Sequence, residues 1–205
     1  MKDPRDQIIS AIDVNAIRIR NPARFIFFCG GSVSNAPDVE PPTSMRDLCI
    51  RWLKKNASTT FEKICLAEKI SERVKDHVYK RDPIYTNLID LETDLAKLAD
   101  LIVLIVESPG SIAELGAFSV VDDTRKKIQV FIREERFNAD SFITLGPVRY
   151  LQVNNRGSVR AYWWATKSRD NDVIEHEACS EIVQDICQDI IKADVSSPAS
   201  DTFNK

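Results

Sequence analysis

The stretch Leu101-Ile102-Val103-Leu104-Ile105-Val106 contains six consecutive aliphatic residues, and the turn sequence Glu107-Ser108-Pro109-Gly110 follows it directly. A strand that is buried on both faces is an unbroken apolar run, whereas a strand with one solvent-facing side alternates. The run has the length of a strand and is too short for a typical helix. We therefore expect residues 101–106 to form the central strand of a parallel sheet, with a helix beginning at Ser111.

The same order of strand, turn and helix recurs on both sides of this stretch. A second apolar run, Arg24-Phe25-Ile26-Phe27-Phe28-Cys29, ends at Gly30-Gly31. Further strands are expected at 63–67, 127–132 and 148–151, and helices at 44–55, at 84–99 and along the apolar stripe Ala178, Ile182, Val183, Ile186, Cys187 and Ile190. The alternation predicts an α/β fold, a doubly wound, mainly parallel five-stranded Rossmann-like sheet with flanking helices. Ligands of such sheets bind beyond the carboxyl ends of the strands.

The composition restricts the class of protein. The 205 residues carry a net charge of −3 and are 43% hydrophobic, which supports a packed core and argues against a disordered chain. A mildly acidic total argues against binding of nucleic acid through bulk electrostatics. No apolar run approaches the ~20 residues that span a bilayer, and the polar N-terminus is unlike a signal peptide. We expect a cytoplasmic protein without membrane contact.

The cysteines and histidines give no sign of a metal centre. The five cysteines, which are never spaced as C-x-x-C, are Cys29, Cys49, Cys65, Cys179 and Cys187. This spacing supports neither a disulfide framework nor a zinc site, and most of them are expected to be reduced core residues. The isolated histidines, His77 and His176, are expected to be solvated side chains.

Glycines mark the carboxyl edge of the sheet as the place for a site. Four of the six glycines, Gly30, Gly31, Gly110 and Gly116, lie in or just after the turns that follow two predicted strands. Glycine allows a sharp bend or the close approach of a ligand. The turn Gly30-Gly31-Ser32 could present its amides to a phosphate or a ribose, and a tight turn without a ligand explains it equally well.

The segment after the central strand allows two interpretations. Ser111 and Glu114 fit a capping box, in which Glu114 would bond to the cap residue of its own helix. Gly116 lowers helix stability by roughly 1 kcal/mol relative to alanine, which suggests that something packs or binds there. Glu107 and Glu114 also bracket a helix N-terminus, whose dipole favours the ionised carboxylate that a nucleophile requires.

More carboxylates lie at the same predicted edge. Asp90, Glu92 and Asp94 fall near the start of the helix that leads into the central strand, where Asp90 and Asp94 are explained by the helix dipole. Glu68 follows the second predicted strand and lies at the ligand edge.

At these residues the sequence resembles the nucleoside 2-deoxyribosyltransferase-like fold, and most closely the N-glycosidase effectors that accompany bacterial retrons. The resemblance covers residues 24–152 and rests on 26–31, 91–92, 107–118 and 141–149. It implies an N-terminal helical segment at 1–23, a catalytic domain at 24–152, a C-terminal extension with an amphipathic helix at 153–195, and a flexible tail at 196–205.

The resemblance also implies roles for individual residues. The transferases use a D-x-G-T-x-x-E motif, whose glutamate attacks the anomeric carbon of the sugar. That glutamate corresponds to Glu114, Gly110 and Ser111 match the Gly-Thr step, and Glu92 matches an upstream acid that positions the sugar. The sequence departs from the motif at Ser108, where the transferases carry the aspartate that handles the leaving base.

This departure favours a substrate whose leaving group needs no acid. A neutral purine leaves poorly unless it is protonated, whereas the nicotinamide of NAD is already cationic. The retron effectors are likewise associated with NAD hydrolysis. The expected function is a toxic retron effector that hydrolyses NAD, with the phosphates at Gly30-Gly31, the nicotinamide ribose between Glu92 and Glu114, and Glu68, Ser108 and Ser32 as further contacts. NAD is then a substrate, and neither a cofactor nor a metal is required.

Two other functions fit the same residues: a metabolic nucleoside 2-deoxyribosyltransferase and a non-enzymatic nucleotide sensor. A homo-oligomer is expected, and a retron reverse transcriptase with its multicopy single-stranded DNA is the expected partner. The adjacent Trp163 and Trp164 fit an interface and a half-buried core position about equally well.

Overall fold

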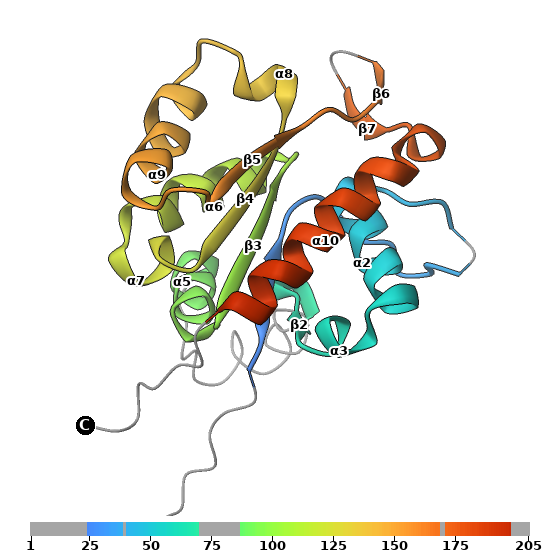
Figure 1. Cartoon of the computed structure of the whole chain (residues 1–205), viewed down its shortest axis with the longest axis horizontal. Helices are drawn as coiled ribbons and strands as arrows, with labels where there is room; N and C mark the ends of the chain where they lie inside the picture. Colours follow the sequence, from blue (N-terminus) through green and yellow to red (C-terminus); the bar gives the residue numbers. More distant parts are fainter. Residues whose placement is uncertain (1–23, 39, 70–86, 169–170, 198–205) are drawn as a thin grey trace, which may run out of the picture.

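A parallel sheet forms the centre of the computed structural model, which describes residues 24–38, 40–69, 87–168 and 171–197 (Figure 1). Its five strands, in the spatial order β2-β1-β3-β4-β5, are β1 (Ile26–Cys29), β2 (Ile64–Cys65), β3 (Leu101–Val106), β4 (Ile128–Arg133) and β5 (Val159–Tyr162). All four pairings are parallel, which confirms the predicted fold class and the central place of β3. This order has its topological switch point between β1 and β3, where doubly wound sheets bind ligands.

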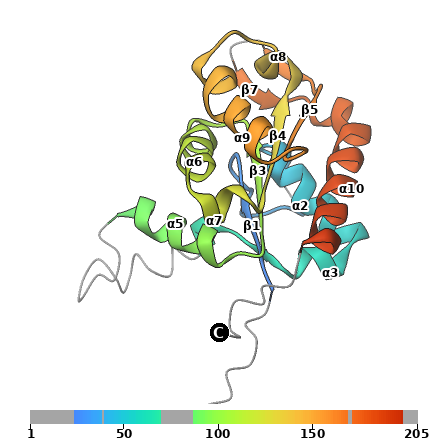
Figure 2. The same ribbon diagram turned by 60° about the vertical axis from the view of Figure 1, so that its left-hand side comes forward.

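Helices cover both faces of the sheet (Figure 2). One face packs against α2 (Met45–Asn56) and α10 (Ser180–Ser196). The other packs against α5 (Leu88–Leu98), α6 (Pro109–Val120), the π-helix η1 (Thr144–Val148) and α9 (Arg149–Asn154). The remaining elements are short: α3 (Ser58–Phe61), α7 (Asp122–Arg125), α8 (Glu134–Phe137), the 3-10 helix η2 (His176–Cys179) and the antiparallel pair β6 (Thr166–Ser168) and β7 (Asn171–Ile174).

The apolar run of β3 supplies both halves of the core. Successive side chains of a strand point to opposite faces. Leu101, Val103 and Ile105 accordingly join the cluster with α2 and α10, while the alternate residues join the cluster with α5 and α6. All six residues are at most 4% exposed. An unbroken aliphatic sequence is therefore required because neither face of this strand meets water.

The structure corrects the predicted fifth strand and the predicted start of the helix after β3. The expected strand at 148–151 is helical, because Val148 and Leu151 are three residues apart and both pack from η1 and α9 onto the sheet. The fifth strand is β5, which comes from the segment assigned above to a C-terminal extension and pairs with β4. The helix expected to begin at Ser111 begins at Pro109.

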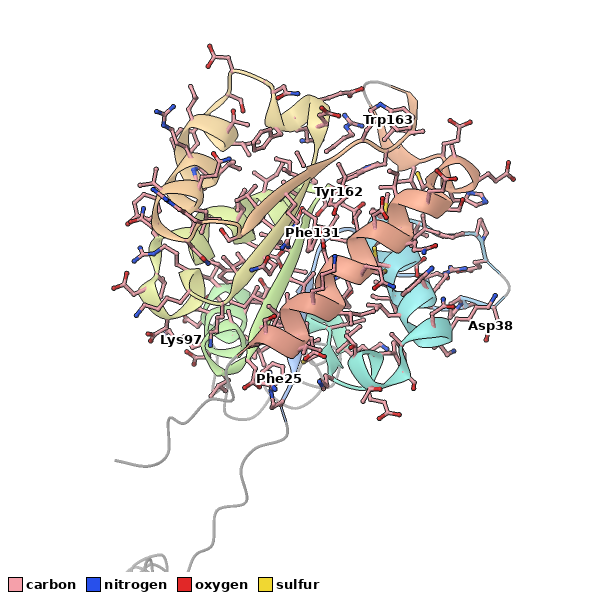
Figure 3. The ribbon with its side chains drawn as sticks, viewed as in Figure 1. Phe25, Asp38, Lys97, Phe131, Tyr162 and Trp163 are labelled. Carbon is pink, nitrogen blue, oxygen red and sulfur yellow. The ribbon has the colours of Figure 1, made fainter. Side chains whose placement is uncertain are left out.

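The two tryptophans have different environments. Trp164 is 3% exposed and belongs to the core, whereas Trp163 is 53% exposed. Figure 3 places Trp163 near the β6–β7 pair and Phe131 and Tyr162 beside α10. The Tyr162 hydroxyl donates a 2.6 Å hydrogen bond to Asp189 of α10, which fastens this helix to β5.

All five cysteines are free thiols, and four of them are buried, as expected. The helix predicted at 1–23, His77 and most of the predicted tail lie outside the described residues. In the described part of the chain, no helix has the length and hydropathy needed to cross a bilayer.

Candidate active site

The switch point between β1 and β3 is held together by the carboxylate of Glu107, which is buried at the end of β3. Its Oε1 accepts hydrogen bonds from the amides of Gly31 (2.9 Å) and Arg46 (3.0 Å), and its Oε2 accepts one from the amide of Met45 (2.7 Å). Amides at a helix N-terminus lack partners within the helix. Glu107 supplies those partners to α2 and joins this helix to the turn after β1, so its role is structural.

The glycines of that turn are explained by the same contact. A Cβ atom on Gly31 would lie 2.6 Å from the Ser44 Cβ and 2.9 Å from the Glu107 Oε1, and one on Gly30 would lie 3.0 Å from the Arg46 Cβ. The Gly31 amide is also engaged by Glu107 and is not available to a phosphate. Close packing of the chain thus explains why glycine is present at positions 30 and 31. That Gly30, Gly31 and the exposed Ser32 contact a ligand stays a prediction.

The N-terminus of α6 is capped by Ser108 and not by the predicted pair. The Ser108 Oγ accepts from the Ser111 amide (3.1 Å), and the Ser111 Oγ accepts from the Ser108 amide (2.9 Å). The capping box predicted between Ser111 and Glu114 is therefore wrong, because Pro109 at the first helical position moves the cap three residues earlier. Ser108 also donates a 3.2 Å hydrogen bond to the Gly30 carbonyl, which joins the two turns.

Glu114 is left free of capping and points its carboxylate into the protein. Its Oε2 is buried and has no hydrogen-bond partner among the residues that the structure describes. Burial raises the pKa of Glu114 to about 7, the charge of Glu92 adds to the shift, and Arg46 and a hydrogen bond with Cys29 oppose it. Desolvation therefore outweighs the helix dipole, which was expected to keep this carboxylate ionised.

The other groups of this site form one electrostatic network with Glu114. Arg46, which is buried, donates to the Phe28 carbonyl (3.1 Å) and forms an ion pair with Glu68. Burial and the charge of Glu68 raise the pKa of Glu92, and Arg46 opposes this shift. The Arg46 guanidinium thus pairs with Glu68, and its charge acts on the predicted residues Glu92 and Glu114.

Sequence reasoning missed Arg46 and Cys29. One feature of the sequence could have pointed to Arg46. A basic residue in the first turn of a helix interacts unfavourably with the helix dipole, so it needs another reason to be there. Burial and the neighbouring charge of Glu114 raise the pKa of the Cys29 thiol well above its usual value. Cys29 is therefore a neutral hydrogen-bond donor in this site and not a nucleophile.

The remaining acidic residues of α5 face away from the network. Asp90 is exposed and its amide donates to the Asn87 Oδ1 (3.0 Å), which caps the helix. Asp94 pairs with Lys97 at 3.4 Å on the surface. Both positions agree with the prediction that Asp90 and Asp94 are explained by the helix dipole. Glu92 differs from them because it interacts with Glu68 and Arg46.

A cavity of about 340 Å³ has Glu68 in its lining, whereas Glu92 and Glu114 are not among its lining residues. Its lining includes the apolar residues Ile50, Phe61 and Leu66, the basic residues Arg51, Lys54 and Lys69, and the acidic residues Asp47 and Glu68. Nowhere in the described ranges do three or more His, Cys, Asp or Glu side chains group in a way that would hold a metal ion. The site therefore offers carboxylates, one guanidinium and an adjoining pocket that both basic and acidic side chains line.

Comparison with known proteins identifies the family of this chain. The sequence pattern of the STM3845 retron effector protein matches residues 42–205, which is well over half of the chain. The chain belongs to the STM3845 retron effector family. Every residue of the Arg46, Glu68, Glu92 and Glu114 network lies inside the matched region.

Two relatives of this retron effector come from Escherichia coli. A protein of retron Ec73, whose name assigns it ribosyltransferase and DNA-binding roles, is 31% identical over 141 residues, which cover 67% of this chain and 41% of that protein. A protein of retron Ec86 with a corresponding name is 46% identical over 74 residues, which cover 36% of this chain and 24% of that protein. The retron effector described here therefore spans less than half the length of either relative.

Proposed function

We propose that this retron effector cleaves the N-glycosidic bond between nicotinamide and ribose in NAD, with Glu114 as the nucleophile. The observation that carries the proposal is the buried Oε2 of Glu114, which has no hydrogen-bond partner in the described part of the chain. A buried carboxylate oxygen without a partner is costly, so such atoms call for an explanation by function or by a bound group. An anomeric carbon that develops positive charge is a suitable partner for it.

The reaction can be written with the residues of the network. The Glu114 carboxylate attacks C1′ of the nicotinamide ribose, the C1′–N bond breaks, and its electron pair returns to the pyridinium ring, which leaves as neutral nicotinamide. Water then attacks C1′ of the glycosyl ester, Glu114 departs as a carboxylate, and one proton is released with ADP-ribose. In this scheme Glu92 holds the ribose and accepts the proton of that water.

The electrostatics of the site suit a cationic substrate. In the free protein, a pKa of about 7 leaves Glu114 divided between its neutral and ionised forms at neutral pH. The positive nicotinamide ring would favour the ionised form, because an opposite charge nearby lowers the pKa of a carboxyl group. The same positive charge makes an acid unnecessary for the leaving group, which is consistent with Ser108 in place of an aspartate.

The pocket beside Glu68 would accommodate the remainder of a dinucleotide. Its apolar lining residues suit an adenine ring, and Lys54 and Lys69 suit the pyrophosphate. Nicotinamide mononucleotide has the reactive bond but lacks the adenosine half. In the Lys54→Gln variant we expect KM for NAD to rise several-fold and KM for nicotinamide mononucleotide to stay unchanged; an equal rise for both would place the dinucleotide elsewhere.

The decisive experiment measures nicotinamide release from NAD by the full chain, alone and together with the products of its neighbouring genes. The second condition is needed because a retron effector can be held inactive by its partners. We expect Glu114→Gln to lower the rate at least a thousandfold, and the exposed carboxylate control Glu134→Gln to retain it. Unchanged activity of Glu114→Gln, with its fold verified by circular dichroism, would refute the assignment.

Two other functions give different results in the same samples. A nucleoside deoxyribosyltransferase would produce an exchanged deoxynucleoside when it is given a deoxynucleoside and a second free base. A nucleotide sensor would bind NAD without turnover in every assembly state. The relatives named for ribosyltransferase activity favour glycosyl chemistry at this site over a sensor.

A further inference from the structure

An apolar hollow lies on the flank of α6 away from the Glu114 network. It has a volume of about 670 Å³ and opens between α6 and the segment formed by η1 and α9. Figures 1 and 2 show α6 and α9 together on the side of the sheet opposite to α10. This hollow has no part in the proposed function.

Large apolar side chains surround the hollow and are exposed to an unusual degree. The exposed fractions are 66% for Val120, 85% for Phe142, 58% for Leu145, 43% for Tyr150 and 70% for Val153. Single exposed apolar residues are common on protein surfaces, but contiguous patches of several hundred Å² mark interaction sites. We call these five residues the α6–α9 patch.

Gly116 lies at the wall of the hollow and has no neighbour that would require a glycine. Apart from its chain neighbours and the backbone of its own helix, a Cβ atom at this position would have no described atom within 4 Å. Glycine is unfavourable in the middle of a helix, so its presence calls for close approach by another group. The described part of this chain supplies no such group, so a second molecule is one source of it.

The size and chemistry of the patch fit a second copy of the chain. Its five side chains expose on the order of 500 Å². A standard interface buries about 800 Å² of each partner, and homodimer interfaces are about 65% apolar. The patch thus supplies about the apolar area that one half of a homodimer interface needs.

The shape of the patch is also self-complementary. Phe142 projects beside the hollow that Gly116 lines, so one surface carries both a projection and a recess. Tyr150 is held in place by a 3.0 Å hydrogen bond from Arg125 and by the Arg125 guanidinium 5.4 Å from its ring. Rigid aromatic anchors of this kind dominate interface energies.

We propose that the chain forms a two-fold homodimer through the α6–α9 patch, in which Phe142 of each copy enters the hollow over Gly116 of the other. Arg149 lines the hollow, and Asp122 pairs with Arg125, which in turn bonds to Tyr150, so charges of both signs adjoin the patch. Because Gly116 and Glu114 lie on the same helix, the dimer would also restrain the helix that carries the proposed nucleophile.

The oligomeric state of the full chain tests this proposal, by light scattering on a sizing column at 10–100 µM. We expect a dimer for the wild type and a monomer for Gly116→Leu and for Phe142→Asp, with dimerisation weakened at least tenfold. Gly116→Leu is the sharper variant, because leucine favours the helix and fills only the hollow, so folding should not suffer. The control Val195→Asp, at a 79% exposed position of α10, should remain dimeric.

A direct contact gives a second readout. When Gly116→Cys and Phe142→Cys proteins are mixed and oxidised, we expect a disulfide between the two chains, and none when either is mixed with Val195→Cys. A wild-type chain that is monomeric at 100 µM would overturn the proposal, as would a dimer that survives both Gly116→Leu and Phe142→Asp. These measurements report association and not NAD cleavage, so the two proposals can fail separately.

Discussion

Two carboxylates on the segment that joins β3 to α6 have opposite environments although they are seven residues apart. Glu107, at the end of β3, accepts three hydrogen bonds from backbone amides. Glu114, in the middle of α6, has a buried Oε2 without a partner in the described ranges. Burial raises the pKa of both carboxyl groups, but at Glu107 the three amides oppose this shift.

The difference shows how a site can be recognised on a buried edge of a sheet. A carboxylate whose oxygens are satisfied by amides stabilises the fold, whereas one that lacks partners is available to a substrate. The number of fixed donors separates the two roles, and burial alone does not. The predictions below test this distinction, beginning with the largest expected effect.

Replacement of Glu107 by alanine should strongly destabilise the protein. The variant leaves the amides of Gly31, Met45 and Arg46 buried without an acceptor, at an expected cost of about 3–5 kcal/mol. Urea unfolding monitored by circular dichroism measures the effect. The exposed control Glu134→Ala should change stability by less than about 0.5 kcal/mol. A loss below about 1 kcal/mol at Glu107 would contradict its structural role.

Replacement of Glu114 by glutamine should stabilise the protein at alkaline pH while it abolishes activity. The pKa of Glu114 rises from 4.5 to about 7 on folding, so the folded chain holds a proton that the unfolded chain has released, and stability is lost as pH rises through this window. Glutamine has no charge to bury. The advantage of the variant should grow from about zero below pH 4.5 to on the order of 2 kcal/mol at pH 8.

Thermal unfolding across this pH range measures the advantage, which corresponds to a rise of several degrees in Tm. Glu107→Gln provides the matched comparison, because it should destabilise the protein at every pH. If Glu114→Gln were also destabilising at pH 8, Glu114 would have to be engaged by partners as Glu107 is.

The smallest effect should be a shift of the pH–rate profile in the Glu92→Gln variant. The ionised form of Glu114 is the nucleophile, so kcat/KM for NAD should rise with pH through about 7 in the wild type. Removal of the negative charge of Glu92 lowers the pKa of Glu114, and the rising limb should move to lower pH by about half a unit. An unmoved limb would mean that Glu92 does not act on Glu114 through its charge.

Sequence patterns predicted most of the strands and helices, because a buried segment must consist of apolar residues at the spacing of its secondary structure. The run Leu101–Val106 predicted a central strand, and Ser44 predicted the start of α2, as observed. The expected strand at 148–151 failed because four residues with two apolar positions fit either periodicity, and only packing against the sheet selected the helix. Of the residues in the candidate site, Glu68, Glu92 and Glu114 were predicted from the sequence and its resemblance to a family, and Arg46 and Cys29 were not.

The sequence by itself determined the alternation of strands and helices, the edge at which the site lies and the acidic residues near it, because these depend on local patterns of apolar residues and turns. Only the tertiary structure decided which carboxylate is held by three amides and which keeps a buried oxygen without a partner among the described residues. That outcome depends on amides and a guanidinium contributed by α2, which the chain places more than sixty residues before Glu107 and brings alongside it only through the packing of the sheet. Hydrogen bonding and desolvation at a buried site are properties of the assembled neighbourhood, and a linear pattern does not contain them.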